Sequence, residues 1–310
     1  MAQNVAKGWT ALLAFAGVAL FGTAANAAPL SIRQLGAQQL RLATVGYRIG
    51  AANARLCRIP RVLTGLVLHD LTQYEPAARA AVSSAFSLHG GFGVLEVVPG
   101  SVGERAGLRV DDEILTLNGG SLEAPEAVAN ARQSYRRLGE FLDSLGRSLR
   151  AGSADLLVRR RGQTLHVRLN GQPACGGEAL VVNSSSLNAW SDGSNVVVTT
   201  AMMDLAADDD ELAFVVGHEM AHNILGQSSR QDARGLLGLF GFGAAKARRE
   251  ETSADELAVP LMSSGGYRPA GAVELLASAR KALWWNVSLD HPGFGERIRH
   301  VAAAIARLPR

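Results

Sequence analysis

Two histidines and a glutamate within five residues give the strongest chemical signal in this 310-residue chain. Residues 218–222 read H-E-x-x-H, inside a stretch that predicts a helix beginning near Asp208. Residues four apart share one face of a helix, so His218 and His222 can bind the same metal ion. Glu219 lies beside them, where its carboxylate can take a proton from an activated water. The spacing predicts a metal-dependent hydrolase with Glu219 as general base.

A catalytic zinc site of this kind needs a third protein ligand and one position for water. Glu251, on the next predicted helix, is the candidate. Asp255 would lie one turn later on the same face, where it could accept the far N–H of a ligating histidine and fix its tautomer. Glu250 is the competing ligand, but its offset of five from Asp255 breaks this shared face. The alternative is an ordinary acidic start of a helix.

Two apolar segments ahead of the motif helix predict strands. They are residues 180–182 and 196–200, and the tripeptide Asn188-Ala189-Trp190 lies between them. Backbone groups of these three residues could align a polypeptide substrate as an added strand. The region from residue 178 to the C-terminus therefore predicts an α+β domain, with the active-site helix beside a small mixed sheet.

Several short segments run in order along this region: Asn188-Ala189, Val197 to Thr200, Asp210 to Ala213, the H-E-x-x-H, Glu251 with Ala254-Asp255, and His291-Pro292 with Glu296 to Ile298. In these segments the region resembles the HtpX-like gluzincin metallopeptidases, which include the CAAX prenyl proteases. The resemblance implies a zincin-type fold, one Zn²⁺ per chain bound by His218, His222 and Glu251, and endopeptidase activity on polypeptides, unfolded or envelope proteins among them.

His291 is the site residue with the most open role. It precedes Pro292, which biases it away from helix and into a loop. From such a loop it could donate a hydrogen bond to the oxyanion, or bind the fourth zinc position and hold the enzyme latent. The remaining alternative is a histidine that only caps the following helix.

Residues 88–170 change to short strands and turns and resemble a PDZ domain of the bacterial arrangement. The loop Gly90-Gly91-Phe92-Gly93 would then point backbone N–H groups at the C-terminal carboxylate of a bound peptide. Many PDZ domains carry a bulky apolar residue where Gly90 stands, so an altered or closed pocket is the alternative. The other matching residues are Pro99-Gly100-Ser101, Ala106-Gly107-Leu108 and Asn118-Gly119.

The first 27 residues predict a cleavable signal peptide. Lys7 precedes an apolar stretch, and Ala25-Asn26-Ala27 offers a small-x-small site with cleavage after Ala27. The apolar stretch is short for a bilayer span, which needs about 20 residues. We therefore expect a periplasmic or secreted protein with no transmembrane span in its mature chain.

The two cysteines agree with export, and the net charge bears on the class of partner. Cys57 and Cys175 are the only cysteines, and an oxidising compartment favours a disulfide between them, with two separate buried thiols as the alternative. The 31 basic and 28 acidic residues leave a net charge of +3, which gives no support for nucleic acid as a partner.

These signals predict an ordered series of parts: a signal peptide (1–27), a helical N-terminal segment (28–87), a β-rich PDZ-like domain (88–170), a linker (171–177) and a zinc metallopeptidase domain (178–310). The function that we predict is envelope protein quality control by peptide-bond hydrolysis. The alternatives are an inactive chaperone stabilised by zinc and a PDZ-type peptide-binding module. An intact Glu219 argues against both, because a structural zinc site needs no general base.

Overall fold

The computed structural model describes residues 28–57, 61–124, 128, 131–227, 244–282 and 293–309. The chain divides into two compact units, residues 1–47 with 61–173 and residues 48–60 with 174–310. Helix α2 (Ala28–Ala52) supplies residues to both units. The predicted signal peptide, with its cleavage site after Ala27, lies outside the described residues and stays a prediction.

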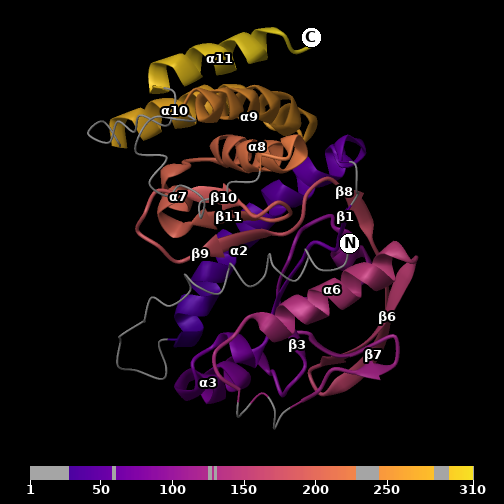
Figure 1. The fold of residues 1–310 in the computed structure, drawn as a ribbon. Helices are drawn as coiled ribbons and strands as arrows, with labels where there is room; N and C mark the ends of the chain where they lie inside the picture. The colour runs from indigo at the N-terminus through magenta and orange to yellow at the C-terminus, as the bar shows by residue number, and fades with distance from the viewer. Residues whose placement is uncertain are drawn as a thin grey trace. The chain divides into compact units, whose positions relative to one another are not determined.

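An antiparallel sheet forms the centre of the first unit (Figure 1). Its strand order is β2-β3-β4-β6-β7, and a sixth strand, β5, pairs with β4. The strands are β2 (Leu66–His69), β3 (Phe92–Val97), β4 (Glu113–Leu117), β5 (Gly120–Ser121), β6 (Ser153–Arg160) and β7 (Gln163–Asn170). Among the described residues, helices α3 (Pro76–Phe86), α4 (Val102–Arg105) and α6 (Arg136–Arg150) also belong to this unit.

Helix α6 closes the core of this unit. Leu138, Phe141 and Leu145 recur at the three- and four-residue spacing of one helix face, and all are buried in the same cluster as Phe92 and Ile114 of the sheet. The rings of Phe92 and Phe141 stack with their centroids 4.2 Å apart. The first unit therefore has a hydrophobic core of its own.

The prediction of a helical segment through residue 87 is wrong for residues 61–69. These residues form β1 (Arg61–Leu63) and β2, and β2 pairs with β3. Leu66-Val67-Leu68 is a short apolar run, which periodicity alone cannot assign to helix or strand. The sheet therefore takes in residues well before the predicted boundary at residue 88.

The second unit contains a three-stranded sheet of order β10-β11-β9. The strands are β9 (Ala179–Val182), β10 (Ala189–Ser191) and β11 (Val196–Thr199). Strand β11 pairs parallel with β9 and antiparallel with β10, so the sheet is mixed, as the sequence predicts. A short helix, α7 (Thr200–Leu205), follows directly, and the Thr199 side chain caps it by accepting a hydrogen bond from the Met202 amide.

Helices α8 to α11 lie in successive layers on this sheet (Figure 1). Helix α8 (Asp209–Leu225) contacts the sheet, and α9 (Ala244–Ser264) and α10 (Ala270–Ala282) contact α8. Helix α11 (Phe294–Ala306) lies outermost, against α9 and α10. Asp208 caps α8 by accepting a hydrogen bond from the Glu211 amide, and Gly226 ends it in a left-handed conformation with φ of 67°. No helix in the described ranges combines the length and apolar character that a bilayer crossing requires.

Helices α8 and α9 approach closely because small residues line their contact. A Cβ atom at Gly217 would lie 3.1 Å from the carbonyl oxygen of Ala258 on α9. One turn away on each helix, Ala221 and Ala254 are fully buried. This spacing matters for the site, because the residues of α9 that face α8 include the predicted ligand Glu251.

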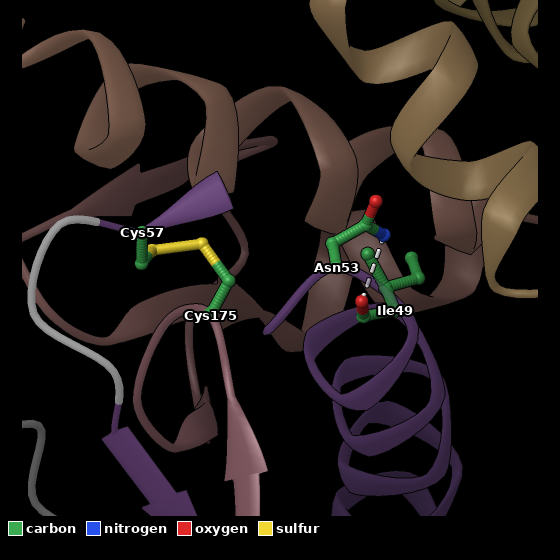
Figure 2. Close-up of a disulfide and its surroundings, with 4 residues drawn as sticks. All are labelled: Ile49, Asn53, Cys57 and Cys175. Carbon is green, nitrogen blue, oxygen red and sulfur yellow. Dashed lines mark hydrogen bonds between the residues drawn. A yellow bond between two sulfur atoms is a disulfide. The ribbon is translucent and has the colours of Figure 1, made fainter. Parts of the chain in front are cut away.

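A disulfide joins Cys57 and Cys175, with their Cα atoms 5.1 Å apart (Figure 2). It closes a sequence separation of 118 residues, which the chain-entropy model values at about 5 kcal/mol. The same figure shows Asn53 donating through Nδ2 to the Ile49 carbonyl, and that Nδ2 also donates to the carbonyl of Leu261 on α9. Residues 48–57 are thereby tied into the second unit.

The predicted linker, 171–177, is part of the folded structure rather than a spacer. Its first residues form β8 (Gln172–Ala174), which pairs with β1, and Cys175 takes part in the disulfide. Gly176 packs on the Met220 side chain, and the Gly177 amide donates to the Ser194 carbonyl. Glycine and proline in this segment mark tight packing and turns, which composition cannot distinguish from a spacer.

Candidate metal centre and active site

Three side chains from two helices converge at one point. His218 and His222 project from the same face of α8, and their Nε2 atoms lie 3.1 Å apart. The Glu251 carboxylate on α9 lies 3.5 Å from each of these nitrogens. All three side chains are largely buried, and their ligand atoms lie within 4.8 Å of one another.

The three separations fit a tetrahedral metal ion. Zinc binds imidazole nitrogen and carboxylate oxygen at about 2.0–2.1 Å, which places tetrahedral ligand atoms about 3.3 Å apart. The two Nε2 atoms lie 3.1 Å apart, and each lies 3.5 Å from a different oxygen of Glu251, so the separations are close to that value. Two imidazoles and one carboxylate are also the donor set of catalytic zinc sites, which keep a fourth position for water. The residues therefore fit the predicted ion.

Asp255 lies behind the first histidine, as the sequence predicts for a residue that orients a ligand. Its Oδ1 atom is 2.9 Å from Nδ1 of His218, and the carboxylate is fully buried. This contact leaves Nε2 of His218 directed at the other two ligand atoms. Burial opposes ionisation of Asp255, but hydrogen bonds and charge from Arg297 and His218 outweigh it, so the pKa of Asp255 is lowered.

Sequence reasoning assigned no role to Arg297, although it lies in one of the segments that carried the metallopeptidase resemblance. Its guanidinium donates to both oxygens of Asp255, from Nε to Oδ2 at 2.8 Å and from Nη2 to Oδ1 at 2.7 Å. Arg297 belongs to α11, more than forty residues after Asp255. Only the packing of α11 on α9 reveals this pair.

Glu219 follows the first histidine on α8 and is 7% exposed. Burial raises the pKa of its carboxyl to about 7, the charge of His218 opposes the shift, and the charge of Glu251 adds to it. A carboxyl with a pKa near the working pH can both accept and return a proton. The electrostatics of Glu219 therefore suit a general base.

The two histidines differ in proton affinity. Burial disfavours the charged form of His218, yet hydrogen bonds and charge from Asp255 and Glu251 raise its pKa to about 10. Burial and the neighbouring charge of His218 lower the pKa of His222 to about 4.

Among the described strands, β10 lies at one end of the three-stranded sheet, and it contacts helix α8. The Asn188 carbonyl accepts a hydrogen bond from the Thr199 amide, and the register gives Trp190 the same kind of pairing with Val197. Because hydrogen-bonded and non-bonded positions alternate, Ala189 directs its N–H and C=O away from β11. Of the three residues predicted to align substrate, Ala189 has the suitable backbone orientation.

The predicted role of His291 stays a prediction, because this residue and Pro292 lie outside the described residues.

In the loop Gly90-Gly91-Phe92-Gly93, the Gly91 amide is already paired with a carboxylate of the same chain. The Gly91 amide donates to Oε1 of Glu113, 2.9 Å away, and the same oxygen accepts from the His89 amide. Glu113 is 1% exposed, so the loop already binds a carboxylate of its own chain. Phe92 and Gly93 belong to β3, which pairs on one side with β2 and on the other with β4.

The glycines of this loop serve internal packing. A Cβ atom at Gly91 would lie 2.4 Å from the Ile114 carbonyl oxygen, and one at Gly93 would lie 2.4 Å from Nε2 of His69. Among the described strands, the ends of this sheet are β2 and β7. A peptide that extended the sheet would have to pair with one of those strands rather than with β3.

Two histidines one turn apart, a carboxylate on the neighbouring helix and a buried acid next to the first histidine have the residue types and spacing of catalytic metal sites in peptidases. Comparison with known families agrees. Residues 158–247 match the model described as Peptidase family M48. The match includes the H-E-x-x-H motif and ends before Glu251, Asp255 and Arg297.

Two curated proteins of Escherichia coli (strain K12) are similar to this chain. Metalloprotease LoiP is 26% identical over 163 residues, which cover 43% of this chain and 63% of that protein. Metalloprotease YcaL is 29% identical over 168 residues, which cover 44% of this chain and 65% of that protein. Each match spans less than two thirds of the relative's own length.

Solved structures match the chain weakly. The PDZ domain of HtrA3 bound to a phage-derived ligand has a TM-score of 0.28 and 18% identity, and the match covers 37% of this chain and 89% of that one. The HtrA-type protease AlgW with a decapeptide has a TM-score of 0.27 and 16% identity, with 37% and 30% of the two chains covered. TM-scores of this size carry no argument about peptide binding.

Proposed function

We propose that this protein is a zinc-dependent metalloendopeptidase that hydrolyses peptide bonds of polypeptide substrates. The observation that carries the proposal is that donor atoms of His218, His222 and Glu251 lie within 4.8 Å of one another, with the Glu219 carboxylate on the helix of the two histidines. The similarity to Peptidase family M48 and to two metalloproteases supports the same reaction.

Each residue has a defined task in this reaction. His218, His222 and Glu251 would hold the ion, which when bound polarises the scissile carbonyl and makes water more acidic. Glu219 accepts a proton from the attacking water at its carboxylate and later delivers it to the leaving amine. Asp255 keeps Nδ1 of His218 engaged, so that the ring presents Nε2 to the metal position.

Strand β10 is the part of the site that we expect to hold the substrate backbone. It lies at an end of the small sheet and contacts α8. An extended polypeptide could add to this edge through the N–H and C=O of Ala189. Such pairing uses main-chain groups, so it favours broad recognition of unfolded polypeptides over recognition of one sequence.

We also propose that the enzyme is exported and acts on envelope proteins in quality control. The signal-peptide pattern of residues 1–27 and the disulfide between Cys57 and Cys175 support an oxidising compartment. His291 remains a candidate oxyanion donor or latching ligand.

The direct test is hydrolysis of unfolded casein by the purified mature chain, with and without a zinc chelator. We expect cleavage that stops on chelation and returns when zinc is added back. Cleavage that persists after complete metal removal would contradict the proposal. No cleavage by a zinc-loaded, folded protein would favour the alternative of an inactive chaperone or binding module.

A further inference from the structure

Arg297 forms a planar, two-bond contact with Asp255 in the interior of the second unit. Both bonds are short, at 2.7 and 2.8 Å, and they use both carboxylate oxygens. The Asp255 side chain is fully buried, and that of Arg297 is 17% exposed. Since Asp255 also contacts Nδ1 of His218, three residues on three different helices form one continuous chain: Arg297 on α11, Asp255 on α9 and His218 on α8.

A buried carboxylate needs such a partner to remain ionised and in place. Taking a charge out of water is costly unless an opposite charge and hydrogen bonds compensate it. The arginine fork matches the two carboxylate oxygens geometrically, which fixes the plane of the carboxylate as well as its position. Asp255 is thereby held from α11 while it orients His218 on α8.

The charge of Arg297 also reaches the other acids of the site. It stabilises the ionised forms of both Glu219 and Asp255 and interacts with Glu251. Arg297 and the His218 ring therefore offset the mutual repulsion of these neighbouring carboxyl groups.

We propose that Arg297 is a positioning residue of the metal site. By clamping Asp255, it fixes the ring orientation and tautomer of His218 and so sets the zinc affinity, which makes the C-terminal helix a functional part of the site. The inference rests on the proposed zinc site but does not depend on peptidase activity. The competing role for Arg297 is purely structural, as a tie between α11 and α9.

The zinc dissociation constant, measured by competition with a chromophoric chelator, separates the two roles. We expect Arg297→Gln to weaken zinc binding by roughly 10–100-fold, the size typical for loss of a group that orients a ligand. Arg299→Gln removes the same charge from an exposed position of the same helix and should leave zinc affinity unchanged. Thermal midpoints of the metal-free variants report any purely structural cost.

Two further variants test whether Arg297 acts through Asp255. In an Asp255→Asn background, Arg297→Gln should add little to the loss of affinity, because interacting residues are non-additive. Arg297→Lys keeps the charge but loses the fork, so it should bind zinc with intermediate affinity.

An Arg297→Gln variant with a lowered metal-free thermal midpoint and unchanged zinc affinity would overturn the inference, as would full additivity with Asp255→Asn. Failure of the wild-type chain to bind zinc would instead overturn the proposed function. Zinc binding without hydrolysis would leave the inference standing.

Discussion

Burial raises the pKa of both acids of the site, Glu219 and Asp255, but neighbouring charges reverse the shift for Asp255. Glu219 is buried with opposing charges nearby, and its pKa rises to about 7, whereas the pKa of Asp255 is lowered by Arg297. One carboxyl is thereby suited to exchange a proton and the other to hold a fixed charge. Environments that separate the pKa values of neighbouring acids are typical of acid–base catalysis.

The same physics in the first unit gives a testable pH dependence. His69 is 3% exposed, and burial, with a smaller effect of the Arg33 charge, lowers its pKa from 6.5 to about 4. The unfolded chain therefore binds a proton at His69 between pH 6.5 and 4 while the folded chain does not. Stability present above pH 6.5 is lost as the pH falls towards 4, by about 3 kcal/mol.

Hydrogen exchange of the β2 and β3 amides, measured at pH 7 and 4.5, checks this expectation. The wild-type chain should lose protection that a His69→Gln variant does not lose over the same interval. Equal losses in the two chains would show that His69 is not the group responsible. The glutamine retains polar atoms that can replace the 2.8 Å contact between Nδ1 of His69 and the Tyr74 hydroxyl.

For single residues, the sequence predicts groups that lie close together along the chain. It does not predict contacts between residues far apart in the sequence. H-E-x-x-H places two ligands by spacing alone, and the four-residue offset selects the pair Glu251 and Asp255 that the structure brings to the histidines. Arg297 lies beyond such reasoning, because no local pattern connects α11 to α9. The glycines of the loop at Gly90 indicate that another group approaches the backbone closely. In the structure that group belongs to the same chain: a Cβ atom at Gly91 would meet the Ile114 carbonyl oxygen.

At the scale of elements, the site depends on how closely α8 and α9 approach. Gly217 makes this approach possible, since a Cβ atom there would meet the Ala258 carbonyl oxygen at 3.1 Å. The ligands come from both helices, so a wider gap would move Glu251 away from the histidines. Packing of small residues therefore affects the geometry of the proposed metal site.

Gly217→Val tests this dependence. We expect the branched side chain to push α9 outward, lower the free energy of unfolding by about 1–3 kcal/mol and weaken zinc binding. Gly217→Ala is the matched control, because a single methyl group needs a shift of only a few tenths of an ångström and gains helix propensity. Zinc affinity that is the same in the valine variant and the wild type would contradict the link between helix spacing and the metal site.

The secondary structure is predicted correctly where its signals are local and wrongly where it depends on a distant partner. The helix from Asp209 to Leu225 follows from its cap, its apolar spacing and its terminal glycine, all of which are local. The strand at Leu66 to His69 depends on its pairing with β3, more than twenty residues away. Sequence periodicity carries no information about such a partner, which is why the helical prediction failed there.

At the scale of the whole molecule, each unit is assembled from separated parts of the chain. Residues 48–57 join the second unit through the Asn53 bond to Leu261 and the disulfide to Cys175. The predicted disulfide between Cys57 and Cys175 already links these two parts of the chain. The predicted linear series of domains nevertheless misses the shared unit, because the bond from Asn53 to Leu261 leaves no local pattern. The change from a region rich in strands to one rich in helices follows the order of the predicted elements.

The central claim is that a metal bound by His218, His222 and Glu251 works with Glu219 as the proton acceptor. Glu219→Gln tests it most directly, because the amide keeps the size of the side chain and cannot accept the proton. The measurement is casein hydrolysis together with zinc content on the same purified samples. Glu250→Gln is the matched control, since it removes a neighbouring carboxylate that we do not place in the site.

We predict that Glu219→Gln retains one zinc per chain and loses hydrolysis by roughly 10²–10⁴-fold, while Glu250→Gln retains both zinc and activity. A Glu219→Gln variant with full zinc content and near wild-type turnover would contradict the account.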